Sequence, residues 1–325
     1  MKRLISIAVM ALVIVGVVAA PAFAVVTDGA HYYSGSTIEA AQVYGPSYSY
    51  LPVNDAGWGT SVPAELCWKH TSWPLITGSP AQYISNSYYI TGNIGTNQWR
   101  WYRIMVGEIP GNAVNIVPSG YMKVNSDNAD RTFINGREAG TDGEVEGAFV
   151  DNHEWATIQN YALQPGDMKI GKNYVDVIVR NYAGTNTATG NPTGFIYDFS
   201  ATWEYTEVQT DVKPGSDPSA FNWNGAGKVP VAILGNEYFD VRKIDAATVT
   251  MNGAVVGVRG KKDPTTMASY SDTNGDGYED LVVQIVDTDG DVIPSGTVEV
   301  KIAWNLLSAY GGTAMWDMAD IKLVQ

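Results

Sequence analysis

Apolar and polar residues alternate with a period of two along much of the chain, as in β-strands that bury one face. The clearest example runs from Phe195 to Tyr205, where six apolar residues alternate with mostly polar ones. Residues 98–106 and 174–180 are also predicted to be strands, and the first of these is rich in aromatic residues. These patterns predict a sheet protein.

A turn signal lies between two of these segments. Asn135-Gly136 separates residues 132–134 from Arg137-Glu138. Asparagine and glycine both tolerate positive φ, so the pair predicts a β-hairpin with a type I′ turn.

The pattern changes after Tyr205. Residues 206–221 include Pro214-Gly215, which indicates a connection and not a core element. We therefore expect a domain boundary near residue 208. Shorter strands are expected beyond it, over residues 229–234, 248–251, 280–286 and 297–302.

These elements together indicate an all-β fold. No long amphipathic helix is predicted after residue 24. The length of 325 residues suits about two domains. We predict two β-sandwich domains, the first jelly-roll-like over residues 25–207 and the second immunoglobulin-like over residues 208–325.

The first 24 residues are typical of a secretion signal. Lys2 and Arg3 precede an apolar run, and Ala22-Phe23-Ala24 has the spacing of a cleavage site. An uncleaved membrane anchor is the alternative. We expect an extracellular or cell-surface protein with no membrane span after cleavage.

The charge and the cysteine content limit which partners and which disulfides the chain can have. The chain carries 34 acidic and 20 basic residues, a formal charge of −14, which disfavours nucleic acid as a partner. Cys67 is the only cysteine, so disulfides within the chain are excluded. Its apolar neighbours predict a buried thiol.

An acidic loop near residue 275 predicts a calcium site. Oxygen-bearing side chains recur at alternate positions, as in loops that wrap a calcium ion. The position where an EF-hand carries a bidentate glutamate is Val283, so the loop is not a complete EF-hand. An acidic, glycine-rich turn without an ion is the alternative. The expected calcium ligands are Asp272, Asn274, Asp276, Tyr278 through its carbonyl group, and Asp280.

The second half resembles a module of bacterial and archaeal secreted and surface proteins. The resemblance implies an extracellular sandwich joined to varied partner domains, and it implies no activity. The segments that carry it are Asp211–Ser216, Val229–Gly235, Phe239–Val241, Ile244–Val249 and Asp272–Val283.

The first half resembles the galactose-binding-like jelly roll over roughly residues 98–205. Such domains bind glycans in some proteins and support a neighbouring domain in others, so the fold alone does not decide the function. The segments that carry the resemblance are Met122–Gly140, Leu163–Gly166, Gly171–Asn173, Val177–Asn181 and Thr193–Phe195.

Aromatic and polar residues in the first half suggest where a glycan would bind. Aromatic faces stack on sugar rings, and carboxylate and amide groups bond hydroxyl groups. The alternative is that the aromatic residues fill the core and the polar ones form an ordinary turn. The candidate glycan-binding residues are Trp99, Trp101, Asp127, Asn128 and Asp130.

Sequence motifs of catalysis are missing. His153-Glu154 lacks the second histidine of a zinc helix, and no Gly-x-Ser-x-Gly elbow, P-loop or dinucleotide fingerprint occurs. We therefore expect no enzyme. The leading hypothesis is a secreted or cell-surface, non-catalytic protein with an envelope, adhesion or assembly role, stabilised by calcium. The alternatives are a glycan-binding accessory module and a self-assembling extracellular structural subunit. The expected partners are glycans, cell-envelope components or further copies of the chain.

Overall fold

A computed structural model describes most of the chain. The described residues are 25–36, 41–88, 96–148, 154–183, 192–216, 219–222, 227–287, 293 and 297–324. The predicted secretion signal, residues 1–24, lies outside them and stays a prediction.

The described residues form strands and a few single helical turns, which confirms the predicted all-β fold. In this part of the chain we find no helix with the length and apolar character needed to span a membrane. The helical turns are η1 (Ala56–Trp58), η2 (Glu154–Ala156), η3 (Val241–Lys243) and η4 (Ser308–Tyr310).

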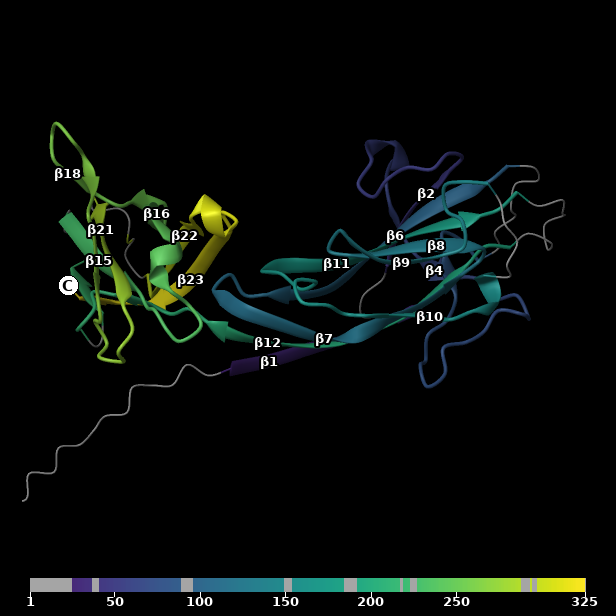
Figure 1. The fold of residues 1–325 in the computed structure, drawn as a ribbon, viewed down its shortest axis with the longest axis horizontal. Coiled ribbons are helices and arrows are strands. Elements are labelled where there is room, and N and C mark those ends of the chain that lie inside the picture. Colours follow the sequence, from purple (N-terminus) through teal and green to yellow (C-terminus); the bar gives the residue numbers. More distant parts are fainter. Residues whose placement is uncertain are drawn as a thin grey trace, which may run out of the picture.

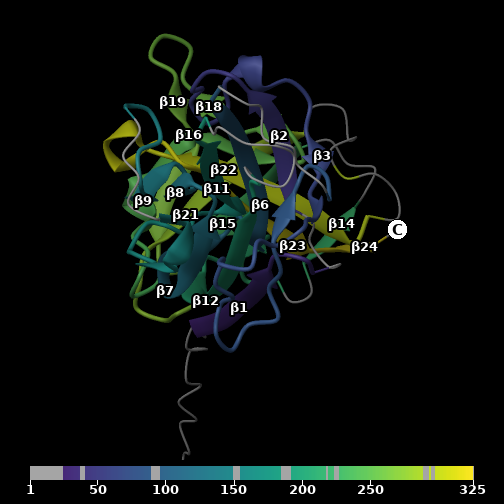
Figure 2. The ribbon, with the colours of Figure 1, turned by 90° about the vertical axis from the view of Figure 1, so that its right-hand side faces the viewer.

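The first half builds two sheets that lie face to face (Figures 1 and 2). Its strands are β1 (Val25–Tyr33), β2 (Gln42–Ser47), β3 (Val62–Pro63), β4 (Glu65–Leu66), β5 (Ile84–Ser85), β6 (Gln98–Ile109), β7 (Ala113–Ser126), β8 (Ala129–Ile134), β9 (Arg137–Asp142), β10 (Gln159–Ala162), β11 (Gly171–Asn181) and β12 (Phe195–Glu207). One sheet has the order β10-β7-β12-β5-β4, with β1 paired to β12, and the other has the order β3-β2-β6-β11-β8-β9.

Strand β12 contains the predicted strand 195–205. Phe195 and Trp203 point into the core between the sheets and are at most 2% exposed. The opposite face of β12 is predicted to be mostly exposed to solvent. Near the start of the strand, other residues cover this face. Ile196 is buried there in a second apolar cluster that includes Cys67, whose predicted burial is confirmed.

Strands β6 and β11 are covered on both faces. Their inner residues, such as Tyr102 and Val177, belong to the core between the sheets. Their outer residues include Trp99 and Trp101, which pack in a separate cluster with Trp58 from η1. A loop therefore shields part of the outer face of this sheet.

The predicted hairpin joins β8 to β9. Ile134 pairs with Arg137 across a two-residue turn. Asn135 and Gly136 have φ of 46° and 85°, as a type I′ turn requires.

The second half forms another sandwich. Its strands are β13 (Thr210–Val212), β14 (Ala220–Asn222), β15 (Gly227–Ile233), β16 (Ile244–Met251), β17 (Ala254–Val255), β18 (Val258–Arg259), β19 (Thr265–Thr266), β20 (Ala268–Ser271), β21 (Asp280–Asp287), β22 (Glu299–Leu306), β23 (Ala314–Asp320) and β24 (Lys322–Val324). Sheets β13-β15-β21-β20 and β17-β16-β22-β23 enclose a core that contains Val231, Ile285 and Trp304. Strand β14 pairs with β24, and β18 pairs with β19.

The two halves meet where the β6–β7 turn contacts β23. The Asn112 side-chain amide donates a hydrogen bond to Asp317 at 3.1 Å, and the Trp316 backbone N–H donates one to the Gly111 carbonyl at 3.1 Å. Among the described residues, no sheet contains strands from both halves. The predicted boundary near residue 208 falls in the link between β12 and β13 and stays a prediction.

Candidate functional site

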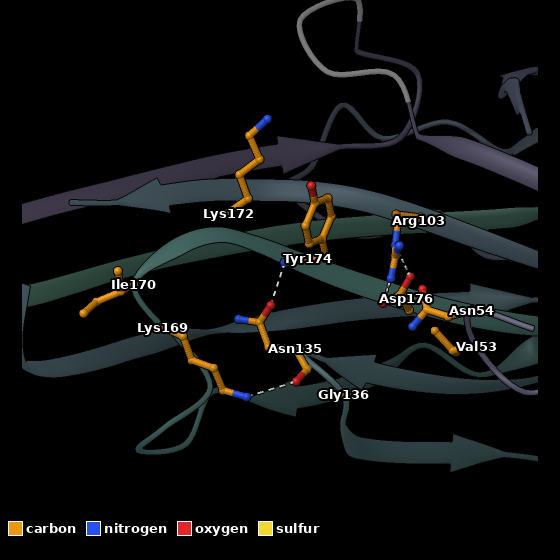
Figure 3. Close-up of a pocket in the computed structure, with 10 residues that line it drawn as sticks. All are labelled: Val53, Asn54, Arg103, Asn135, Gly136, Lys169, Ile170, Lys172, Tyr174 and Asp176. Carbon is orange, nitrogen blue, oxygen red and sulfur yellow. Dashed lines mark hydrogen bonds and ion pairs between the residues drawn. The ribbon is translucent and has the colours of Figure 1, made fainter. Parts of the chain in front are cut away.

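A pocket of about 310 Å³ opens over the outer face of β6 and β11 (Figure 3). Strands provide its floor, and loops and the β8–β9 turn provide its walls. The lining residues are Val53, Asn54, Arg103, Asn135, Gly136, Lys169, Ile170, Lys172, Tyr174 and Asp176.

An ion pair lies on the pocket floor. Arg103 on β6 and Asp176 on β11 are direct partners in the strand register. The guanidinium Nε lies 2.8 Å from Asp176 Oδ1, and the second nitrogen lies 3.1 Å from Oδ2. The Trp101 indole N–H also donates to Oδ1 at 2.7 Å. Three charge-assisted hydrogen bonds therefore fix this carboxylate in place.

Aromatic rings hold the arginine from two sides. The Arg103 guanidinium lies 4.8 Å from the Trp101 ring centroid and 4.9 Å from that of Tyr174. Tyr44 stacks on Trp101 at 4.1 Å. Flat groups in contact lose few conformations when a ligand arrives, so this row of side chains is preorganised.

Amide side chains fix the strand beside the pocket. Asn135 accepts a hydrogen bond from the Tyr174 backbone N–H at 2.9 Å. Buried Asn173 donates to the carbonyl groups of Lys169 and Gly171. The β6–β11 register shifts between Asn173 and Tyr174, and such a bulge re-aims neighbouring side chains. Figure 3 shows Lys172 and Tyr174 rising from β11 on the same side.

The five predicted glycan-binding residues lie outside the set that lines the pocket. Trp99 and Trp101 are at most 6% exposed, and their indole N–H groups bond the Val145 carbonyl and the Asp176 carboxylate. Trp101 therefore supports the pocket from behind.

The other predicted glycan contacts surround the turn between β7 and β8. Asp127 accepts from the Trp73 indole at 3.1 Å, and Asp130 accepts from the Ser126 hydroxyl at 3.0 Å. Burial raises the pKa of each carboxyl to about 7, and these hydrogen bonds oppose the rise. The Asn128 side chain accepts the Tyr182 backbone N–H. Glycan binding by these residues stays a prediction.

The predicted calcium loop lies between β20 and β21. The Asp272 carboxylate accepts the backbone N–H groups of Gly275 and Gly277 at 2.7 and 3.0 Å, which curls the loop. Asp276 accepts the Tyr278 N–H at 2.9 Å. No three His, Cys, Asp or Glu residues of the described chain are grouped closely enough to hold a metal.

Asp280 differs from the other predicted calcium ligands because it is fully buried. One of its oxygens accepts the Gly235 N–H, and the other accepts the N–H and hydroxyl of Thr273. This carboxylate ties the loop to the segment that follows β15. Calcium coordination by the five predicted residues stays a prediction.

Comparisons with known proteins give weak matches. No protein-family model matches the chain, and no curated protein matches it. Among solved structures, a protein from Bacteroides fragilis assigned as a beta-galactosidase is 13% identical, with a TM-score of 0.29, over 90% of this chain and 41% of its own. A beta-glucuronidase from an uncultured Clostridium species is 13% identical, with a TM-score of 0.25, over 91% of this chain and 45% of its own.

A third match, the beta-glucuronidase of Faecalibacterium prausnitzii, is 11% identical, with a TM-score of 0.27, over 90% of this chain and 46% of its own. The chain therefore spans less than half the length of these structures. At such identities and TM-scores, they do not assign an activity to this chain.

These matches correct one prediction. We expected a non-catalytic envelope, adhesion or assembly protein, with a self-assembling structural subunit among the alternatives. The three structures described above are glycosidases by name, and this finding overturns that expectation. The prediction that the chain is not an enzyme stays a prediction.

Proposed function

We propose that the pocket over β6 and β11 binds carbohydrate. The observation that carries this proposal is the Arg103–Asp176 pair, which is fixed by Trp101 and flanked by the Tyr174 ring on the pocket floor. The volume of about 310 Å³ is at the low end for small-molecule sites.

The chemistry of the floor suits a sugar. Each sugar hydroxyl both donates and accepts hydrogen bonds, and a fixed guanidinium beside a fixed carboxylate offers both roles. The C–H face of a sugar ring packs on aromatic carbon, which the Tyr174 ring supplies. No described residue bonds the Tyr174 hydroxyl, which therefore remains available to a ligand.

A glycan array followed by calorimetric titration tests the proposal. Tyr174→Ala should weaken the binding of retained oligosaccharides at least tenfold, about 1.4 kcal/mol. The matched control is Tyr270→Ala, because Tyr270 also packs under an arginine, with the Arg242 guanidinium 4.6 Å from its ring centroid. Absence of any retained glycan, or equal losses in the two variants, would contradict the proposal.

We also propose that the loop over residues 272–280 binds calcium outside the cell. The supporting observation is its curled shape, in which the Asp272 carboxylate accepts backbone N–H groups while Asn274 is exposed and Asp276 partly exposed. Carboxylate and amide oxygens are the ligands that calcium prefers. The ion would fix the approach to β21.

A further inference from the structure

The pocket carries positive charge in an acidic protein. Its ten lining residues include three cationic side chains and one carboxylate, a formal charge of plus two, whereas the whole chain carries −14. Arg103 and Asp176 neutralise each other. The surplus therefore belongs to Lys169 and Lys172.

Neither lysine is neutralised by a described carboxylate. Lys169 Nζ donates to the Asn135 carbonyl at 3.2 Å, a neutral partner. Lys172 lies opposite Glu108 in the strand register, but no ion pair within 4 Å joins Lys172 to Glu108 or to another described acid. Asp167, which lies two residues before Lys169 in the sequence, is paired with Arg137.

The lysines are held on two sides of the aromatic floor. Lys172 precedes the bulge on β11 and rises beside Tyr174, whereas Lys169 comes from the preceding loop and reaches toward the β8–β9 turn (Figure 3). Both side chains are exposed. A ligand resting on Tyr174 would therefore meet ammonium groups at its edge.

We propose that this pocket selects saccharides that carry a carboxylate or sulfate group, an inference that rests on the proposed carbohydrate function. Each ammonium group binds an anionic substituent on its own side of the floor, while Tyr174 and the Arg103–Asp176 pair hold the ring. An acidic protein repels anions at long range, so selectivity requires this local positive charge. Two exposed ion pairs together give between about twofold and about thirtyfold selectivity.

Calorimetric titration of the full chain tests this selectivity. The probes are an oligogalacturonate, a sulfated galactan oligosaccharide and a neutral galactan oligosaccharide, each at low and physiological salt. The double variant with Lys169→Gln and Lys172→Gln should bind an anionic probe about tenfold more weakly and the neutral probe unchanged. Added salt should remove most of the difference, because exposed charges are screened.

A matched control separates a local effect from overall charge. Lys261 and Lys262 are exposed in the second half, and Lys261→Gln with Lys262→Gln removes the same charge. Equal losses in both double variants, or an anionic affinity that Lys169→Gln and Lys172→Gln leave unchanged, would overturn the selectivity. If the neutral probe still binds in a Tyr174-dependent way, only this inference fails. If no saccharide binds the wild type, the carbohydrate function fails with it.

Discussion

Two buried carboxylates in the first sandwich have quite different partners from the one on the pocket floor. Asp176 faces the Arg103 guanidinium. Asp127 and Asp130 instead accept hydrogen bonds from an indole and from hydroxyl groups, all of which are neutral. Without a cation, desolvation favours the protonated acid, which is why burial raises the pKa of both.

The raised pKa values predict a pH-dependent stability. An unfolded aspartate titrates near pH 3.9, whereas these two titrate near pH 7 in the folded chain. Between these values the folded state holds more protons, so their contribution to the free energy of unfolding is full below about pH 4 and falls until about pH 7. The loss approaches about 1.4 kcal/mol per pH unit for each group.

Urea unfolding of the wild type and of a double variant with Asp127→Asn and Asp130→Asn measures this contribution. The variant lacks the titration, so its stability relative to the wild type should increase as the pH rises from 4 to 7. A difference between the two proteins that does not change with pH would contradict the assignment.

At the scale of elements, the alternation of apolar and polar residues predicted the strands that have one apolar face. Strand β12 and the β8–β9 hairpin were predicted on that basis. Strand β7 was not, because Pro118 and Gly120 usually mark breaks in a strand. Pairing with β12 overrides that tendency. A Cβ atom on Gly120 would lie 2.2 Å from the Ser200 carbonyl oxygen, so the close approach requires glycine.

The pocket could be predicted only in part. Trp99, Trp101 and Arg103 occupy alternate positions, so an arginine shares the strand face of the two tryptophans, and such a face need not be wholly buried. The strand register that sets Asp176 opposite Arg103 joins residues far apart in sequence, so alternation within each strand could not reveal it. The bulge before Tyr174 likewise could not be predicted from the sequence, because a register shift depends on the partner strand.

The proposed calcium site lies in the loop that precedes β21. At a hundredfold excess over the dissociation constant, calcium should add about 2.7 kcal/mol to the free energy of unfolding. Thermal melting with calcium and with a chelator measures this, and Asp276→Ala should remove the response. Asp245→Ala, a change to an acid outside the loop, serves as the control. An unchanged wild-type midpoint, or a variant that still responds, would refute calcium binding by this loop.

Across the whole molecule, hydrogen bonds and a tryptophan contact join the two sandwiches. Asp317 accepts hydrogen bonds from the Asn112 side chain of the first half and from the backbone and side chain of Thr210. Trp316 lies against Gly111, where a Cβ atom would come within 2.3 Å of its indole nitrogen. This glycine permits the turn between β6 and β7 to approach β23.

Gly111→Ala should therefore loosen the junction. Displacing the Trp316 ring, which is 39% exposed, should lower the free energy of unfolding by about 0.5–1 kcal/mol. Limited proteolysis should cleave the link between β12 and β13 faster. Gly227→Ala is the control, because a Cβ atom there meets nothing within 4 Å. Identical cleavage rates in the two variants would show that Gly111 is not needed at the junction.

The most direct test of the carbohydrate pocket is a crystal structure of the full chain with the saccharide that it binds most tightly. We predict density for a sugar ring against Tyr174, with hydroxyl groups bonded to Arg103 or Asp176 and any anionic group near Lys169 or Lys172. A saccharide seated elsewhere on the chain, with the pocket over β6 and β11 holding only solvent, would contradict the proposal.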